Sequence, residues 1–451
     1  MKLFNTMARK KEELKSIEDK KIRLYTCGPT VYDMVHIGNL RAYIVNDLLK
    51  RTLIENGYDV FHVINITDVD DKTIKRSEGE KTSFEKLVKK YEEKFWSDMD
   101  ELNNLQPTKV TRATQYINKI VSLIEDLVEK SFAYKSSDGS VYFSIEKFKD
   151  YGKLSRLDKS GIKSGARVSQ DEYDKQNPSD FALWKAWVEE DGEIFWETSL
   201  GKGRPGWSIE CSAMSMDVLG ETLDIHTGGV DLIFPHHENE IAQSEAKTGK
   251  KFVNYWVHNE HLLVNNTKMA KSLGNFFTLD DIKQKGFSPL DFRYLVLGAH
   301  YRSKLNFTLE SLTAAKNSRE RLNNIVDNFK SESDGNIDKK YYEEFIDKIS
   351  DDVDVPGALA VLWNMIRDEN VDKADKYKTA LLMDKVFGLN LGQVEEEDVP
   401  QEIIELAEER KRAKNDKDFR LADEIREKIK QKGWLVEDLE DNNYKLNKCF
   451  K

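Results

Sequence analysis

The segment between residues 22 and 67 constrains the fold more strongly than any other part of this sequence. Residues 22–27 alternate apolar and polar side chains, as a β-strand does, and Gly28-Pro29 interrupts the pattern. Residues 39–56 carry apolar side chains at helical spacing, and Gly57 follows where helices commonly end. Residues 60–67 are a second candidate strand. Strand, helix and strand in this order predict a βαβ unit, and therefore an α/β fold built on parallel strands.

The remainder of the chain is predicted to contain four further stretches. Residues 84–200 look like an insertion that is first helical and then rich in turns and aromatic side chains. Sheet-type sequence resumes near residues 223–226 and 253–258, and a helical pattern runs from about residue 308 to residue 391. The acidic stretch 392–400 is typical of a linker, and residues 401–451 contain a charged helical pair followed by a short apolar run.

Composition excludes several classes of protein. With 451 residues, of which 39% are hydrophobic, the chain can bury a substantial core and is long enough for about three domains. Its three cysteines, Cys27, Cys211 and Cys449, are far apart and odd in number, which opposes a disulfide framework and favours a reducing compartment. The sequence shows no secretory signal and no run of about 18 apolar residues, so we expect a cytoplasmic protein that does not span a membrane.

The net charge of −11 argues mildly against a nucleic-acid-binding protein, because contacts with phosphates need clustered cationic side chains. A local basic face can nevertheless exist on an acidic protein, and the C-terminal tail contains a candidate. Its apolar positions recur at helical spacing and are predicted to be buried: Phe419, Ala422, Ile425 and Ile429. Its cationic side chains are predicted to face outward: Arg410, Lys411, Arg412, Lys414, Lys417 and Arg420. The alternative is a solvated helix whose charges pair with nearby glutamates.

Two short segments suggest phosphate binding, although neither is specific by itself. His36-Ile37-Gly38-Asn39 lies where the first predicted strand passes into the helix, and a helix N-terminus attracts phosphate through its free N–H groups. Lys268-Met269-Ala270-Lys271-Ser272 places two lysines in a loop that could offset the charge of a leaving pyrophosphate. The competing interpretations are an ordinary strand–helix loop and a solvated basic turn, and each is more frequent when such a segment stands alone.

A third constellation has the chemistry of a metal site. His236 and Glu240 lie four positions apart on a predicted helix and therefore share a face. With Cys27 and Cys211 they would make a Cys₂HisGlu set, which is acceptable to tetrahedral Zn²⁺. Spacing alone leaves alternatives open, since His237 could replace His236 and the cysteines could be small buried residues that never meet.

Taken together, these segments resemble the signatures of class I aminoacyl-tRNA synthetases, and within them those of the cysteinyl family. The class signatures HIGH and KMSKS correspond to residues 36–39, with Asn39 for the second histidine, and to residues 268–272, with Ala270 for the first serine. Longer strings typical of the cysteinyl family are YTCGPTVYD at residues 25–33, NITDVDDK at 65–72, NPSDFALWK at 177–185, GRPGWSIECSAM at 203–214, DIHTGGVDL at 224–232 and FPHHENE at 234–240. Ser208 departs from the family, which usually has a histidine there.

The resemblance implies an architecture and a set of site residues. The architecture is a Rossmann-type parallel-sheet catalytic domain over residues 1–310, interrupted by the insertion 84–200, then an α-helical bundle over 311–391 and a small anticodon-binding domain over 401–451. The implied ligands of one zinc per chain are Cys27, Cys211, His236 and Glu240. The implied contacts of the bound amino acid are Thr67, Trp207, His226 and Asp231. Those of ATP and its phosphates are His36, Asn39, Lys268 and Lys271, and Tyr444 in the tail is a candidate for stacking on an anticodon base.

The implied function is ATP-dependent ligation of L-cysteine to tRNA(Cys) through a cysteinyl-adenylate, with Mg²⁺ accompanying the ATP and zinc selecting the cysteine thiolate. The implied partners are therefore tRNA(Cys), L-cysteine and ATP, and we expect a monomer. A cysteine ligase that acts on an amino sugar would share the motifs but lack the C-terminal tRNA-binding part. A catalytically inactive paralogue should have lost the signature lysines or the metal ligands, and a structural zinc protein should have closer ligand spacing.

Overall fold

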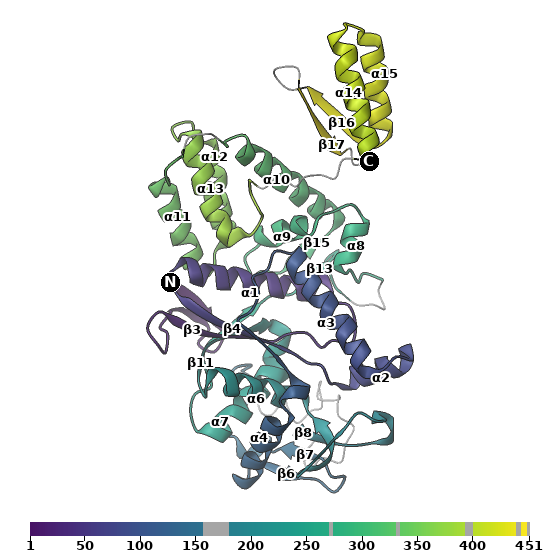
Figure 1. Ribbon diagram of the computed structural model, residues 1–451. Helices are drawn as coiled ribbons and strands as arrows, with labels where there is room; N and C mark the ends of the chain where they lie inside the picture. Colours follow the sequence, from purple (N-terminus) through teal and green to yellow (C-terminus); the bar gives the residue numbers. More distant parts are fainter. Residues whose placement is uncertain (157–179, 270–273, 331–333, 393–399, 439–442, 449–451) are drawn as a thin grey trace. The chain divides into compact units, whose positions relative to one another are not determined.

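The computed structural model describes residues 1–156, 180–269, 274–330, 334–392, 400–438 and 443–448. The chain divides into two compact units, Met1–Leu391 and Gly392–Lys451. The larger unit is built on a parallel sheet, and the smaller one on a pair of helices with a hairpin (Figure 1). Among the described residues, no helix has an apolar stretch long enough to cross a bilayer.

The centre of the larger unit is a five-stranded sheet in the order β12-β11-β3-β4-β5, in which all neighbouring strands are parallel. The strands are β3 (Lys21–Thr26), β4 (Asp59–Ile66), β5 (Lys109–Arg112), β11 (Leu223–Gly229) and β12 (Val253–Asn259). Helix α1 (Ile37–Glu55) connects β3 to β4. The predicted βαβ unit and the Rossmann-type α/β fold are therefore confirmed.

Helices cover both faces of this sheet, because alternate side chains of each strand point to opposite faces. Leu24 of β3 belongs to the core beneath α1, whereas the adjacent Tyr25 belongs to the core on the other face. Three helices supply that second core (Figure 1): α4 (Ile117–Glu129), α6 (Trp207–Leu219) and α7 (Glu238–Thr248).

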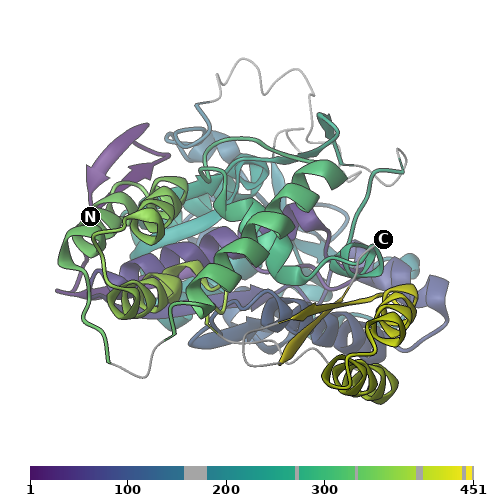
Figure 2. The same cartoon turned by 90° about the horizontal axis from the view of Figure 1, so that it is seen from above.

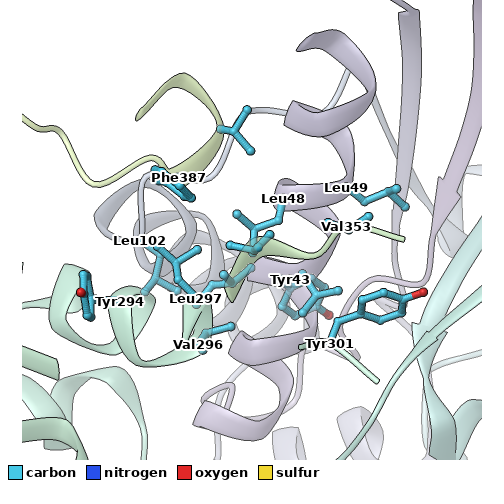
Figure 3. Close-up of a cluster of buried hydrophobic side chains, with 14 of the residues drawn as sticks. Tyr43, Leu48, Leu49, Leu102, Tyr294, Val296, Leu297, Tyr301, Val353 and Phe387 are labelled. Atoms are coloured by element: carbon cyan, nitrogen blue, oxygen red, sulfur yellow. The ribbon is translucent and has the colours of Figure 1, made fainter. Parts of the chain in front are cut away.

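A bundle of helices packs over α1 on the first face. It consists of α9 (Pro289–Leu297), α10 (Leu309–Asp327), α11 (Lys339–Ser350), α12 (Val355–Arg367) and α13 (Lys373–Phe387). In Figure 2 the green helices of this bundle lie in front of the purple helix α1. Leu48 of α1, Leu297 of α9 and Phe387 of α13 lie in one continuous apolar cluster (Figure 3), so the bundle shares its core with the sheet.

The insertion begins later in the chain than the sequence predicts. Helix α3 (Phe84–Glu101) contributes to the core beside α1, and β5 pairs with β4 in the main sheet. The separate part is an antiparallel sheet in the order β6-β7-β8-β10-β9, made of β6 (Ala133–Lys135), β7 (Val141–Phe143), β8 (Phe181–Ala186), β9 (Trp196–Thr198) and β10 (Gly201–Pro205). Strand β5 was not predicted from the sequence because it is a short edge strand with a single apolar side chain, Val110, and therefore shows no alternating pattern.

The remaining elements of the larger unit are short. Two of its sheets are small, one of β1 (Lys2–Asn5) and β2 (Lys10–Glu13), the other of β14 (Thr267–Lys268), β13 (Leu262–Val264) and β15 (Leu305–Phe307). Helices α2 (Asp71–Glu80) and α8 (Leu279–Gln284) also belong to this unit. Single helical turns occupy Ala113–Gln115, Ile145–Lys147, Glu189–Asp191, Val230–Leu232 and Ile233–His237.

The smaller unit contains α14 (Gln401–Asn415), α15 (Phe419–Gln431) and an antiparallel hairpin of β16 (Trp434–Asp438) and β17 (Tyr444–Lys448). Ala422, Ile425 and Ile429 are buried, as predicted. Phe419 is 62% exposed, so the prediction for this residue is wrong. It occupies the first position of α15, outside the apolar cluster of this unit.

The cationic face of the smaller unit is narrower than predicted. Arg410 is 4% exposed and donates two hydrogen bonds, of 2.7 and 3.0 Å, to the Asp438 carboxylate. Lys414 lies 2.9 Å from the same carboxylate, and Tyr444 donates a 2.7 Å hydrogen bond to Glu408. The outward-facing role predicted for Arg410 is therefore wrong, because the hairpin returns an acidic side chain to this helix. Three of the predicted side chains are exposed: Arg412, Lys417 and Arg420.

Candidate active site and metal centre

The candidate site lies at the carboxyl ends of the central strands, where the strand order reverses between β3 and β11. Open α/β sheets bind their ligands in the crevice at such a point. Cys27 directly follows β3, Thr67 directly follows β4, and His226 lies within β11. Helices α6 and α7 contribute Cys211 and Glu240 from the second face of the sheet.

Side chains that can bind a metal converge in this crevice. Cys27, His236, His237 and Glu240 have donor atoms that all lie within 4.8 Å of one another. Sγ of Cys27 is 3.5 Å from Nε2 of His236, 3.5 Å from Nε2 of His237 and 3.8 Å from Oε1 of Glu240. Cys211 is buried beside them and is within hydrogen-bonding reach of Cys27 and His236. The group thus contains three of the four sequence-predicted ligands and adds His237, while the fourth, Cys211, lies beside it.

The spacing of these atoms fits a tetrahedral zinc ion. With Zn–S bonds of about 2.3 Å and Zn–N or Zn–O bonds of about 2.0 Å, tetrahedral ligand atoms lie roughly 3.3–3.8 Å apart, and a sulfur and a nitrogen about 3.5 Å apart. The observed sulfur–nitrogen separation of 3.5 Å and the 3.0 Å between His236 Nε2 and Glu240 Oε1 are close to these values. His237 Nε2 is more distant from the same oxygen, at 3.9 Å. Geometry therefore favours His236 over His237 as the fourth ligand.

Burial and neighbouring charges shift the pKa values of the side chains in the cluster. Burial raises the pKa of the Cys27 thiol, whereas the hydrogen bond with Cys27 lowers the pKa of Cys211 to about 6. Burial disfavours a charged ring at His236, but the adjacent Glu240 carboxylate and Cys211 outweigh it and raise the pKa of His236 to about 10. Burial likewise opposes a charge on Glu240, yet His226 and His236 lower its pKa to about 2. A buried thiolate and a buried carboxylate suit a divalent cation, and this donor chemistry fits zinc.

Other polar side chains hold the candidate ligands in place. Nε2 of His226 is 2.9 Å from Oε2 of Glu240, which leaves Oε1 directed at Cys27. The hydroxyl of Ser208 is 3.1 Å from Nδ1 of His236, so its Nε2 faces the cluster. Second contacts of this kind fix the orientation of a ligand and its ring tautomer.

Two residues that the sequence did not point to, His258 and Thr6, support His237. Nδ1 of His237 is 2.8 Å from Nε2 of His258, and Nδ1 of His258 is 2.8 Å from the hydroxyl of Thr6. The only sequence signal was the position of His237 next to His236. His258 lies inside strand β12 and Thr6 follows strand β1, and nothing in their local sequence marks either residue.

The residues predicted around the amino acid fall into two groups. Trp207 is 38% exposed and stacks on the ring of His236, with 4.0 Å between the ring centroids. Asp231 is also exposed and lies shortly after β11. Its carboxylate is close to Gly229, because a Cβ added to that glycine would lie 2.4 Å from Oδ1 of Asp231. Thr67 and His226 are buried, and Thr67 accepts a 3.3 Å hydrogen bond from Asn65. The first pair can therefore contact a ligand directly, and the second pair lies behind that surface.

The two candidate phosphate-binding segments lie against each other. His36 caps the start of α1, where its Nδ1 accepts the Asn39 N–H at 3.2 Å, and Asn39 is exposed. The N–H of Ile37 donates to Phe277, which lies just beyond the second segment. Gly38 of the first segment is also close to Met269 of the second, because a Cβ added to Gly38 would lie 3.7 Å from Cε of Met269. Lys268 in β14 is exposed, whereas Lys271 lies outside the described residues.

Comparison with known proteins gives matches along most of the chain. Residues 13–317 match the family model for the tRNA synthetases class I (C) catalytic domain. A cysteine–tRNA ligase of Protochlamydia amoebophila is 43% identical over 458 residues, which cover 97% of this chain and 96% of the relative. A cysteine–tRNA ligase of Brachyspira hyodysenteriae is 44% identical over 459 residues, covering 96% of this chain and 97% of the relative.

Solved structures with the same fold have little sequence in common with this chain. Methionyl-tRNA synthetase of Mycobacterium tuberculosis, in complex with methionyl-adenylate, superposes with a TM-score of 0.58 at 12% identity, covering 82% of this chain and 90% of that one. A LeuRS–tRNA–LeuAMS complex from Agrobacterium radiobacter K84 gives a TM-score of 0.56 at 10% identity, covering 84% of this chain and 85% of that one. These likenesses concern the fold alone.

Proposed function

Since the chain belongs to the cysteine–tRNA ligase family of class I aminoacyl-tRNA synthetases, we propose that it joins L-cysteine to tRNA(Cys) through a cysteinyl-adenylate. The observation that carries this proposal is the cluster of Cys27, His236, His237 and Glu240 at the switch point of the sheet, with the buried Cys211 beside it. It lies in a chain whose relatives named cysteine–tRNA ligase match it over almost its whole length.

In the proposed first step, a carboxylate oxygen of cysteine bonds to the α-phosphorus of Mg·ATP while the bond to the pyrophosphate oxygen breaks. No side chain acts as a nucleophile, so the protein contributes positioning and electrostatic stabilisation. We assign the phosphate and ribose oxygens to His36 and Asn39 at the start of α1. Lys268 and Lys271 are assigned to the charge that develops on pyrophosphate. In the second step, a terminal ribose hydroxyl of the tRNA displaces AMP from the cysteinyl carbonyl.

Selection of cysteine over serine is assigned to the cluster. A cavity of fixed shape separates near-isosteric side chains only weakly. A zinc ion held by Cys27, Cys211, His236 and Glu240 would supply a Lewis acid that bonds a thiolate strongly and an alcohol poorly. We assign the apolar part of the amino acid to the exposed face of Trp207 and its ammonium group to the Asp231 carboxylate, because both side chains are exposed beside the cluster.

Pyrophosphate exchange tests the proposed function directly. Purified protein should catalyse exchange of pyrophosphate into ATP with cysteine and far more slowly with serine or any other amino acid. It should also charge tRNA(Cys), and we expect it to do so as a monomer. Exchange without charging would favour the amino-sugar ligase, and an absence of exchange with every amino acid would favour an inactive paralogue.

Removal of the smaller unit should separate the two steps. We propose that residues 401–451 form the anticodon-binding part, because this unit has its own apolar core and holds none of the candidate ATP or metal residues. A chain truncated after residue 391 should retain most of its cysteine-dependent pyrophosphate exchange. Its kcat/KM for tRNA should fall at least about tenfold, since phosphate contacts are lost. Unchanged charging kinetics in the truncated protein would contradict the assignment.

A further inference from the structure

A cavity lies between helix α3, the end of strand β5 and the insertion, and we refer to it as the α3 cavity. Its volume is about 610 Å³, which is within the usual range for a small-molecule site. Helix α3 forms one wall, because Val88, Glu92 and Trp96 recur every four positions and share a face. Residues 193–196 of the insertion, which lead into β9, also line it. Of the described residues that line the cavity, none belongs to the candidate ATP, amino-acid or metal sets.

Aromatic rings make up much of the wall of the α3 cavity. Two come from α3 and two from the insertion: Phe84, Trp96, Phe195 and Trp196. All four side chains are only partly buried, so part of each ring is open to a ligand. Next to the cavity, such rings already hold one ammonium group, since Nζ of Lys202 lies 3.5 Å from the centroid of the Trp187 ring and 3.9 Å from that of Phe195. Aromatic walls of this kind attract cations as well as apolar groups.

The charged side chains of the α3 cavity leave a surplus of carboxylates. Both of its cations are already paired, since Nε of Arg112 lies 3.1 Å from each carboxylate oxygen of Glu92 and Nζ of Lys89 lies 3.8 Å from Glu93. Three other lining carboxylates form no ion pair within the described ranges of the chain: Asp68, Glu85 and Glu193. The cavity therefore favours a cationic ligand over a neutral or anionic one.

The three unpaired carboxylates come from three different segments. Asp68 lies shortly after β4, Glu85 is in the first turn of α3, and Glu193 comes shortly before β9. Asp68 is 4% exposed, and its two oxygens accept hydrogen bonds of 2.9 and 2.5 Å from the N–H and the hydroxyl of Thr114. Burial raises the pKa of Asp68, so a nearby cation would stabilise its ionised form. A ligand suited to all three carboxylates carries several separate charges rather than one.

We propose that the α3 cavity binds an aliphatic polyamine, a linear ligand in which short methylene chains join the ammonium groups. The ammonium groups pair with the carboxylates of Asp68, Glu85 and Glu193, and the methylene chains lie against the aromatic rings. A triamine carries three charges at neutral pH, which equal the three unpaired carboxylates in number. A compact monocation would pair with only one of them. This inference goes beyond the proposed function and does not depend on it.

The test is isothermal titration calorimetry of the full-length protein with spermidine, a triamine, at low ionic strength. We expect one site per chain in wild-type protein. In a Glu85→Gln/Glu193→Gln variant the dissociation constant should rise at least about tenfold, because two of the three charge pairs are lost. Both glutamates are exposed, so the melting temperature without ligand should stay close to that of wild-type protein. Trp196→Leu should raise the dissociation constant about threefold or more, since it keeps an apolar side chain but removes a cation–π contact.

Two matched controls make the assignment falsifiable. Octane-1,8-diamine has the length of spermidine but a methylene group in place of the central ammonium, so it should bind more weakly, and equal or tighter binding would overturn the match of three charges. The Glu343→Gln/Glu344→Gln variant removes the same charge from exposed positions of α11, outside the cavity, and should bind spermidine with wild-type affinity. An equal loss in both glutamine variants would mean a general attraction of cations to an acidic protein and would overturn the site. Unchanged affinity in the Glu85→Gln/Glu193→Gln or Trp196→Leu variant, or no binding to wild-type protein, would overturn it as well.

Discussion

Replacement of Cys27 by serine is expected to remove zinc from the protein and to lower cysteine-dependent pyrophosphate exchange by about a thousandfold or more. Loss of a single outer contact to a metal ligand already costs about 10–100-fold in metal affinity or activity, and Cys27 is itself a candidate ligand. Its Sγ faces His236, His237 and Glu240 at 3.5–3.8 Å, so its replacement opens the cluster on the side of strand β3. A serine oxygen is a harder ligand and remains protonated near neutral pH.

The measurement is zinc per chain by elemental mass spectrometry, followed by exchange assays with cysteine. Cys449→Ser is the matched control, because it removes one thiol from the tail and should leave both zinc content and exchange unchanged. Circular dichroism should show that the Cys27→Ser variant is folded, since this residue is only half-buried at the end of a strand whose core side chains remain. A variant that keeps one zinc per chain and wild-type exchange would exclude Cys27 as a ligand.

Local sequence signals were sufficient for the central fold. The alternation in residues 22–27, the helical spacing after Asn39 and the apolar run 60–67 each depend on neighbours in the chain, and they correspond to β3, α1 and β4. The βαβ unit then fixes a crevice at the end of β3, which is where Cys27 and His36 lie. Spacing could not show that Cys27 and Cys211 meet, because their proximity depends on the pairing of β3 with β11 and on the packing of α6 with α7.

The remaining features depend on contacts between segments far apart in sequence. Arg410 is paired because the hairpin returns Asp438 to helix α14, and no helical periodicity contains that information. The support of His237 by His258 joins a helical turn to a separate strand, so neither local pattern predicts it. Arginines on helices look like solvated charges in the sequence, yet Arg51 and Arg293 are buried and form ion pairs with Asp47.

Arg293 is the most consequential of these buried charges for stability. It is completely buried on α9, and its guanidinium donates to the carbonyl of Phe387 at 2.6 Å, to the carbonyl of Leu102 at 2.9 Å and to Asn104 at 2.9 Å. It also lies 2.5 Å from Asp47 of α1. One side chain therefore joins the catalytic sheet's helix α1, the end of α3, and helices α9 and α13 of the bundle.

Replacement of Arg293 by alanine should lower the free energy of unfolding of the larger unit by about 3–5 kcal/mol, because it leaves a buried carboxylate with one cation fewer and several carbonyls without donors. Asp47 would keep only its 2.7 Å pair with Arg51 and the N–H of Leu105. The change is measured as a shift of the urea midpoint followed by circular dichroism. Arg293→Lys should recover only part of the loss, since an ammonium cannot reach all four acceptors at once.

Arg76→Ala is the control, because Arg76 lies on the surface in an exposed pair with Glu80 and its removal should barely move the midpoint. A loss below about 1 kcal/mol for Arg293→Ala would show that this network contributes little to joining the sheet and the bundle.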